Sequence, residues 1–295
     1  MSQSNVVTEP ADRMASRRSE RSIGALLIDA GRLTPQDAER ILRLQREGGM
    51  RFGDAAIKLG LVSAVDIDFA LARQFDYPYL RSGESKVSEK LRAAFNQLSP
   101  EVESLRALRT QLMLRWFDND ASRKALAVVS AGRNEGRSFI AANLAVVFSQ
   151  IGEHTLLIDA DMRNPSQHAL FGLDNRVGLS AVLSDRGGPE VVQRIPGLAH
   201  LSVLTAGILP PNPLELLARP LFPKLLEELG EKFDVILLDS PAAAEHPDAQ
   251  TLVVSAGAAL IVARKNVAPM WRVRGVSDSV APTSAVIVGT VLNDF

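Results

Sequence analysis

Cysteine is absent from the sequence of 295 residues, and this absence removes several classes of chemistry. Disulfides, thiol catalysis and cysteine-based metal sites are excluded. The formal net charge of −1 gives no support for binding to a nucleic-acid polymer. Histidine is scarce, and its spacing matches no metal site, so we interpret all four histidines as ordinary surface or core residues. They are His154, His168, His200 and His246.

Long hydrophobic runs are also missing. The longest, such as Ala256 to Ala263, are too short to span a bilayer. Residues 1–22 are polar, contain a basic cluster and lack the apolar centre of a signal peptide. We therefore expect a cytoplasmic protein whose residues 1–21 form a disordered tail. With 46% hydrophobic residues the rest can bury a sizeable core, and the length suggests about two domains.

One stretch has the layout of a phosphate-binding loop. An apolar run, Leu126 to Val129, leads into a loop of small and polar residues, and a helical stretch, Phe139 to Ser149, follows. The usual loop pattern is (A/G)-x-x-x-x-G-K-(S/T), and this chain carries arginine in place of the lysine. An ordinary strand-to-helix turn is the alternative. The loop reads Ala131-x-x-x-x-Gly136-Arg137-Ser138.

Such a loop binds phosphate oxygens through backbone N–H groups, and the helix N-terminus adds a partial positive charge. Ser138 can ligate Mg²⁺. Arg137 keeps the positive charge, although its planar guanidinium is bulkier than an ammonium group. The nucleotide-binding residues that we predict are Ala131, Gly132, Arg133, Asn134, Glu135, Gly136, Arg137, Ser138 and Phe139.

Two apolar segments that lead into aspartate strengthen this interpretation. Asp159 and Asp161 follow the first and share one side while the chain stays extended, and Asp239 follows the second. Ligands bind at the carboxyl ends of strands in open α/β sheets, and phosphoryl transfer needs Mg²⁺ and a carboxylate near the attacking group. A helix N-cap is the alternative role of such an aspartate, but it does not account for three in this arrangement.

The order of segments predicts the fold. Further apolar segments at residues 256–263 and 284–292 alternate with helical segments such as Pro220 to Gly230. We expect an α/β fold, a P-loop NTPase with a mostly parallel sheet flanked by helices, preceded by a small domain of helical hairpins.

The N-terminal third contains an internal repeat of residues 22–45 in residues 51–74. Each copy predicts a short helix, a turn at a glycine and a second helix, with Thr34 and Ser63 as N-caps. Two such hairpins bury their shared apolar positions against each other. The aligned glycines are Gly24 with Gly53 and Gly31 with Gly60, each pair 29 positions apart (53 − 24 = 29).

This repeat resembles the MshEN domain at the N-terminus of type II secretion and pilus ATPases, whose paired motifs begin R-L-G and end in glutamine. The resemblance implies cyclic di-GMP as a ligand. Two positions depart from the motif, because Ser22 replaces the first arginine and Phe52 replaces a leucine. A pure interaction module is the alternative. Carried over by position, the cyclic di-GMP residues are Ile23, Gly24, Leu42, Gln45, Arg51, Phe52, Gly53, Leu71 and Gln74.

Residues 81–100 are polar and charged, and we expect them to be a linker between a repeat domain (residues 22–80) and a kinase or ATPase domain (residues 101–295). A helical pattern, Glu101 to Trp116, opens the second domain. An acid and two bases, spaced three apart, share one face of this helix, and a solvated face is the usual explanation. They are Glu103, Arg106 and Arg109.

The stretch from Glu101 to Phe295 resembles the bacterial tyrosine kinases, or BY-kinases, which carry E-x-x-R-x-x-R ahead of the phosphate loop and use it for subunit contacts. The loop arginine and the added repeat indicate the exopolysaccharide chain-length-determinant branch of the EpsG type. Positioning ATPases of the MinD and ParA type match less well, because they carry a signature lysine where this chain has Gly132. The other shared motifs are D-x-D-x-R at residues 159–163, PPNP-x-ELL at 210–217, DSP at 239–241 and VLN at 291–293.

The resemblance implies a Mg-ATP-dependent tyrosine kinase. Arg137 and the loop backbone would hold the β- and γ-phosphates, and Ser138 and Asp239 would hold Mg²⁺. Asp159 or Asp161 would activate the acceptor hydroxyl or order the metal's waters, which makes Asp159 a further candidate metal ligand. The resemblance also implies a homo-oligomer, a membrane-embedded polysaccharide co-polymerase as partner, and a peripheral location at the inner membrane through that partner.

The tyrosine content departs from the family. Its kinases usually end in a tyrosine-rich tail, whereas this sequence ends at Phe295 and contains only Tyr77 and Tyr79, so we expect no autophosphorylation of a C-terminal cluster. Two alternatives stay open beside the kinase. One is a nucleotide-gated scaffold in which Arg137 impairs turnover, and the other is a MinD- or ParA-like positioning ATPase.

Overall fold

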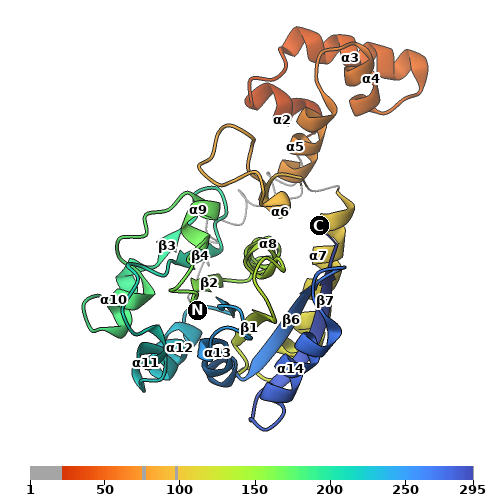
Figure 1. Ribbon diagram of the computed structural model, residues 1–295. Coiled ribbons are helices and arrows are strands. Elements are labelled where there is room, and N and C mark those ends of the chain that lie inside the picture. Colours follow the sequence, from red (N-terminus) through yellow and green to blue (C-terminus); the bar gives the residue numbers. More distant parts are fainter. Residues whose placement is uncertain (1–21, 75–77, 97–98, 295) are drawn as a thin grey trace, which may run out of the picture. The chain divides into compact units, whose positions relative to one another are not determined.

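The computed structural model describes residues 22–74, 78–96 and 99–294 and divides the chain into two compact units, residues 1–79 and 80–295 (Figure 1). The predicted disordered tail, residues 1–21, lies outside the described residues.

The first unit consists of two helical hairpins, as the repeat predicts. Each hairpin turns at a glycine with positive φ, Gly31 at 67° and Gly60 at 66°, in a region that other residues rarely adopt. The four helices in the described residues of this unit are α2 (Ile23–Asp29), α3 (Pro35–Gly48), α4 (Phe52–Lys58) and α5 (Ala64–Gln74).

The predicted N-caps of this unit are confirmed. Thr34 Oγ1 accepts the backbone N–H of Asp37 at 3.1 Å. Ser63 Oγ accepts the N–H of Asp66 at 3.2 Å, while the Asp66 carboxylate accepts the N–H of Ser63 at 3.0 Å, so this pair forms a reciprocal capping box. Apolar side chains from both hairpins then fill a single core.

The second unit is built on a seven-stranded sheet with the order β3-β4-β2-β5-β1-β6-β7, in which β3 pairs antiparallel with β4 and the other pairings are parallel. The α/β fold and the predicted strands are confirmed, while β3 and β4 were not predicted. The strands are β1 (Ala125–Ser130), β2 (Thr155–Asp159), β3 (Gln193–Arg194), β4 (Leu201–Leu204), β5 (Val235–Asp239), β6 (Ala258–Arg264) and β7 (Val286–Asn293).

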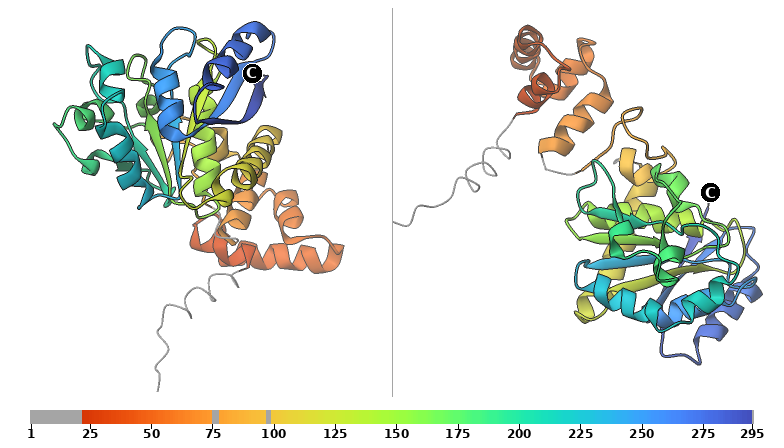
Figure 2. Two further views of the ribbon diagram at one scale, coloured as in Figure 1. Left: turned by 90° about the horizontal axis from the view of Figure 1, so that it is seen from below. Right: turned by 90° about the vertical axis from the view of Figure 1, so that its left-hand side faces the viewer.

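Helices cover both faces of the sheet (Figure 2). One face carries α6 (Arg92–Phe95), α7 (Pro100–Arg115) and α8 (Arg137–Ser149). The other carries α10 (Leu179–Leu183), α11 (Pro213–Leu217), α12 (Leu221–Gly230), α13 (Asp248–Ala256) and α14 (Met270–Val280). The remaining short elements are η1 (Phe117–Asn119), α9 (Gln167–Phe171) and η2 (Pro189–Val191).

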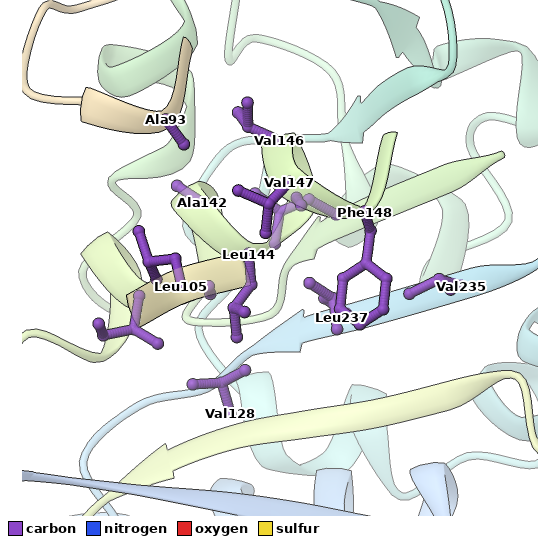
Figure 3. Packing of buried hydrophobic residues seen from close by; sticks show 14 of the residues in the cluster. Ala93, Leu105, Val128, Ala142, Leu144, Val146, Val147, Phe148, Val235 and Leu237 are labelled. Carbon is purple, nitrogen blue, oxygen red and sulfur yellow. The ribbon is translucent and has the colours of Figure 1, made fainter. Parts of the chain in front are cut away.

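Helix α8 is almost entirely buried, because the sheet lies on one side of it and α6 and α7 lie on the other. Figure 3 shows Leu144 and Phe148 of α8 pointing toward Val128 of β1 and Leu237 of β5. This burial explains why residues 139–148 are apolar around the helix, apart from Asn143, rather than along one stripe. The loop that precedes α8 is therefore attached to the most tightly packed helix of the unit.

The expected linker, residues 81–100, is not a tether. Its residues belong to the second unit, and Val87 and Leu91 are buried in the same core as α8. We refer to residues 80–96 as the strap. The linker prediction was wrong because the few apolar residues of the strap are spaced between charged ones, so the local pattern looks solvated.

Two buried polar side chains, one in α8 and one at its C-cap, fasten the strap through the backbone of Ala93. Asn143 Oδ1 accepts the Ala93 N–H at 3.0 Å, and Gln150 Nε2 donates to the Ala93 carbonyl at 2.9 Å. Asn143 is completely buried, and its Nδ2 donates to the Phe139 carbonyl at 2.9 Å. The strap is thereby fixed to the helix that carries the loop.

We predict that Asn143→Leu destabilises the second unit by about 1–3 kcal/mol, because it leaves the buried Ala93 N–H without an acceptor. Urea unfolding followed by tryptophan fluorescence measures this, since both tryptophans, Trp116 and Trp271, lie in that unit. The control is Asn119→Leu, whose side chain is exposed. Equal unfolding free energies for the two variants would contradict the fastening role.

Candidate functional site

Three strands end side by side at the carboxyl edge of the sheet. β5 lies between β1 and β2, and these strands end at Asp239, Ser130 and Asp159. Asp159 and Asp239 are register partners on neighbouring parallel strands, and both are completely buried. The structure therefore brings together the two strand-end carboxylates that the sequence singled out.

Residues 131–136 form the loop between β1 and α8. Gly136 has φ 92°, a backbone conformation that favours glycine. A Cβ at this position would also collide with Asn293 Nδ2, so the available space favours glycine as well. Asn293 Nδ2 donates to the Glu135 carbonyl at 3.0 Å and ties the loop to the end of β7. The Glu135 carboxylate accepts the N–H of Gly132 at 2.7 Å, and its burial raises the pKa of Glu135. The loop is thus held in shape by contacts at both ends.

The Arg137 guanidinium turns inward, toward the strand ends. Nη1 donates to Ser130 Oγ at 2.7 Å, and Nη2 donates to Asp161 Oδ2 at 3.3 Å. Nε lies 3.4 Å from Asp239 Oδ1, within ion-pair distance but without hydrogen-bond geometry. The side chain is 9% exposed, so it neutralises buried carboxylates. Its contact with phosphates stays a prediction.

Asp159 ends β2 and also binds the start of α9. Its Oδ2 accepts the backbone N–H groups of Ser166, the N-cap residue of α9, and of Gln167 at 2.9 Å each, so this aspartate satisfies the helix start from the neighbouring strand without being the N-cap residue itself. Its Oδ1 is buried and has no hydrogen-bond partner among the described residues. Burial, and then the charge of Asp239, raise the pKa of Asp159 well above its usual value. Asp161 accepts the N–H of Asn164 at 2.9 Å in the turn that follows.

Asp239 is oriented by Gln167, a residue that the sequence analysis did not select. Gln167 Nε2 donates to Asp239 Oδ2 at 2.7 Å and to the Ser138 carbonyl at 3.1 Å, which links β5 to the start of α8. Burial raises the pKa of Asp239, and Arg137, Gln167 and Ser138 partly oppose this by stabilising the ionised form. Gln167 escaped prediction because its partners lie 29 and 72 residues away in sequence. Ser130 is only seven residues from Arg137, but no motif marks it as the acceptor for an inward-turned guanidinium.

The donor set fits Mg²⁺. Asp159 Oδ1 and Asp239 Oδ1 are both buried without hydrogen-bond partners among the described residues, at register-partner positions next to Ser138. Within the same part of the chain, His, Asp and Glu side chains form no group of three that would hold a metal alone. Mg²⁺ in phosphoryl-transfer sites takes one or two carboxylates, and phosphates and water complete the shell. The pair is thus sufficient only together with a phosphate ligand.

A cavity of about 700 Å³ opens at this edge. Arg133 to Phe139 and Asp161 line it, whereas Ala131, Gly132, Asp159 and Asp239 do not, and the contact of these residues with a nucleotide stays a prediction. Nine further lining residues were not predicted: two from the strap, four from residues 164–170 and three from the segment after β5. They are Ser88, Lys90, Asn164, Ser166, Ala169, Leu170, Ala242, Glu245 and His246.

A second cavity of about 450 Å³ shares Phe139 with the first. Its lining is largely apolar and comes from α7, α8 and the end of β7, including Leu105, Leu108 and Leu292. An aromatic ring is the kind of group that such a surface accommodates.

The residues predicted for subunit contacts lie on α7, where Arg106 Nη1 pairs with Glu103 Oε2 at 3.1 Å on the surface. Arg109 differs, because its Nη1 donates to the Val147 carbonyl at 2.8 Å and thus binds the last turn of α8 in the same chain. Arg163, the last residue of the D-x-D-x-R motif, forms a two-pronged pair with Asp248 at the start of α13, at 3.1 and 3.3 Å.

The residues predicted to bind cyclic di-GMP fall into two groups. The motif glycines permit close packing, since a Cβ on Gly24 would lie 3.0 Å from the Phe52 ring and one on Gly53 would lie 3.1 Å from Ile67. The apolar residues of the motif with partial burial pack on the core of the first unit: Ile23, Phe52 and Leu71. Leu42 and Arg51 are exposed, and Gln45 and Gln74 are half-buried.

Known proteins resemble about two thirds to three quarters of the chain. No family model matches the chain. The chain is 33% identical over 209 residues to the tyrosine-protein kinase YwqD of Bacillus subtilis, which covers 71% of this chain and 87% of that protein. The chain belongs to the bacterial tyrosine kinase family. It is also 34% identical over 193 residues to the putative kinase CapB of Staphylococcus aureus, of which it covers 83%.

Some bacterial tyrosine kinases are much longer than this match. The chain is 31% identical over 206 residues to wzc of Salmonella typhimurium but covers 28% of it. Among solved structures, the kinase domain of Escherichia coli tyrosine kinase ETK is 31% identical with a TM-score of 0.67, covering 72% of this chain and 83% of that one. The cell division ATPase MinD of Pyrococcus furiosus is 25% identical with a TM-score of 0.51, covering 59% and 73%. The P-loop NTPase fold is thereby confirmed.

Every helix in the described residues is too short or too polar to cross a membrane.

The raised pKa of Asp159 predicts a pH-dependent stability. Because the pKa in the folded state lies above the usual 3.8, ionisation of Asp159 costs folding free energy, and the cost grows as the pH rises through the folded-state pKa. Asp159→Asn keeps an acceptor for Ser166 and Gln167 but carries no charge. Without Mg²⁺, we expect this variant to be more stable than the parent at pH 8 by about 1 kcal/mol or more, with the difference shrinking toward pH 4.

Urea unfolding in EDTA across this pH range measures the difference, with the exposed Asp278→Asn as the matched control. A variant that is less stable than the parent at every pH would show that the ionised carboxylate stabilises the metal-free protein.

Proposed function

We propose that this protein is a Mg-ATP-dependent protein-tyrosine kinase that regulates exopolysaccharide chain length, of the EpsG type. The observation that carries the proposal is the pair of buried strand-end carboxylates, Asp159 and Asp239, beside a phosphate-binding loop. Family membership supports the kinase class, and the loop arginine together with the N-terminal repeat supports the finer assignment.

The roles follow from position and chemistry. The loop amides and the N-terminus of α8 bind the phosphates, and Ser138 and Asp239 hold Mg²⁺. Asp159 is the second candidate ligand through its unpartnered Oδ1. Asp161, which faces the cavity, activates the acceptor hydroxyl or orders the metal's waters. The apolar cavity beside Phe139 accommodates the adenine ring.

The proposed partner is a membrane-embedded polysaccharide co-polymerase that holds the kinase at the inner membrane and contributes to its activation. Copies of the chain assemble through α7, where Glu103 and Arg106 are on the surface. The acceptor is a tyrosine of the partner, or Tyr77 or Tyr79 of this chain.

One observation supports a second candidate function, a nucleotide-gated scaffold without kinase activity. Arg137 is already bound to Ser130, Asp161 and Asp239. A cation engaged in this way does not contact phosphate unless it moves, and its bulk slows that exchange relative to a lysine. Turnover then depends on whether Mg-ATP displaces the guanidinium.

Arg137→Lys distinguishes the two functions by phosphate release from Mg-ATP. If Arg137 is a working substitute, the parent turns over and the variant differs from it by less than about tenfold, since both side chains place one charge near the loop. If the scaffold is correct, the parent is inactive and the variant gains turnover. Arg115→Lys, an exposed change at the end of α7, is the control and should match the parent.

The first unit is proposed to be an MshEN domain that binds cyclic di-GMP. The support is its pair of capped hairpins with a motif arginine, Arg51, exposed to solvent. Binding is allosteric only if the dinucleotide changes the affinity for ATP or for the partner.

We expect saturable binding of cyclic di-GMP to the full chain, and Arg51→Ala should weaken it about tenfold by removing a charge-assisted contact to phosphate or guanine. Calorimetric titration measures both affinities. Arg46→Ala, an exposed arginine on α3 in the spacer between the two motifs, is the control. No saturable binding by the parent, or equal loss in both variants, would refute the assignment.

A further inference from the structure

The strap carries a lysine to the wall of the phosphate-side cavity. Lys90 lines the cavity of about 700 Å³ together with Ser88 and the loop residues Arg133 to Phe139. Within the described residues the Lys90 ammonium makes no ion pair or hydrogen bond, and the residue is exposed. A cation in this position is available to a ligand of the cavity.

The backbone around Lys90 is anchored rather than loose. The Ser88 N–H donates to the Leu170 carbonyl at the end of α9 at 2.8 Å. The Leu91 N–H donates back to the Ser88 carbonyl at 2.9 Å, and Ser88 Oγ accepts the Lys90 N–H at 3.3 Å, so residues 88–91 form a closed turn with Lys90 near its tip. Leu91 itself is completely buried.

The passage of the strap over α9 depends on a glycine. Gly172, which ends α9, has φ 65°, and a Cβ there would collide with the backbone carbonyl of Lys86. Together with the bonds from Asn143 and Gln150 to Ala93, this holds the strap on both sides of Lys90. The position of the turn is therefore determined by α8 and α9, the two helices that also position the loop and Asp159.

Charge pairing distinguishes Lys90 from the other cations of the cavity. Arg137 is held by Asp161 and Asp239, and Arg133 Nε pairs with Glu245 at 2.6 Å. Lys90 is thus the cavity cation with no anionic partner among the described residues. An ammonium on a flexible four-carbon stem binds phosphate as a point charge, which is the part that lysine plays in most phosphate-binding loops.

We propose that Lys90 contacts the terminal phosphate of the bound nucleoside triphosphate and supplies, from the strap, the cation that Arg137 does not supply while it is held by the strand-end carboxylates. The proposal rests on the proposed nucleotide-binding function and adds a binding residue outside every motif of the sequence. It makes residues 80–96 part of the nucleotide site.

The test compares affinities of the full chain for Mg-ATP and Mg-ADP by calorimetry. Lys90→Gln should weaken Mg-ATP about tenfold and Mg-ADP by less than about twofold, because only ATP carries the terminal phosphate. Lys90→Arg should keep most of the preference for ATP. Lys86→Gln, an exposed lysine of the same strap that does not line the cavity, should bind both nucleotides as the parent does.

The outcomes separate this inference from the function on which it rests. A parent that binds neither nucleotide refutes the proposed function itself. A parent that binds Mg-ATP, with Lys90→Gln indistinguishable from it or equally weakened toward ATP and ADP, overturns the role of Lys90 alone. Thermal unfolding midpoints within the error of the parent confirm that the variants are folded, as expected for an exposed side chain.

Discussion

The buried ion pairing of Arg137 with Asp161 and Asp239 is the interaction on which this site depends. The carboxyl edge of the sheet gathers acids on neighbouring strands, and their burial is costly unless a cation compensates them. Arg137 is the first residue of α8, so the compensation comes from the phosphate-binding loop itself. The ion pairs of Arg137 therefore both neutralise the carboxylates at the edge of the sheet and fix the start of α8, next to the loop.

Nucleotide binding has to reorganise that balance. Mg²⁺ at Asp239 would take over the neutralising role of Arg137, which would leave the guanidinium available to phosphate. The raised pKa values of Asp159 and Asp239 show that, without metal, burial still disfavours the ionised form of both carboxylates. On this account arginine in place of lysine adjusts how tightly the empty site holds its own cation. The strap then matters because it offers a second cation that takes no part in this exchange.

Local patterns predicted most of the fold, and long-range contacts account for what they missed. The hairpins of the first unit follow from Gly31, Gly60 and two N-caps within a few residues of each turn. The strand ends follow from apolar runs that stop at aspartate. The strap was mistaken for a linker because the contacts that bury it come from α8, which is distant in sequence. Leu91 packs in the same core as α8, and the Ala93 N–H is bound by Asn143, 50 residues further along the chain. The inward turn of Arg137 could not be predicted either, because Asp161, 24 residues away, and Asp239 at the end of β5 come next to it only in the folded sheet.

The most direct test of the central claim is transfer of labelled γ-phosphate from ATP by the purified protein with Mg²⁺, with and without the cytoplasmic part of a co-polymerase. We expect acid-stable label on tyrosine that is lost in Asp159→Asn. Free phosphate without labelled protein would make the protein an ATPase switch instead of a kinase. Bound ATP with neither product would contradict phosphoryl transfer at this site and leave Arg137 as the residue that blocks it.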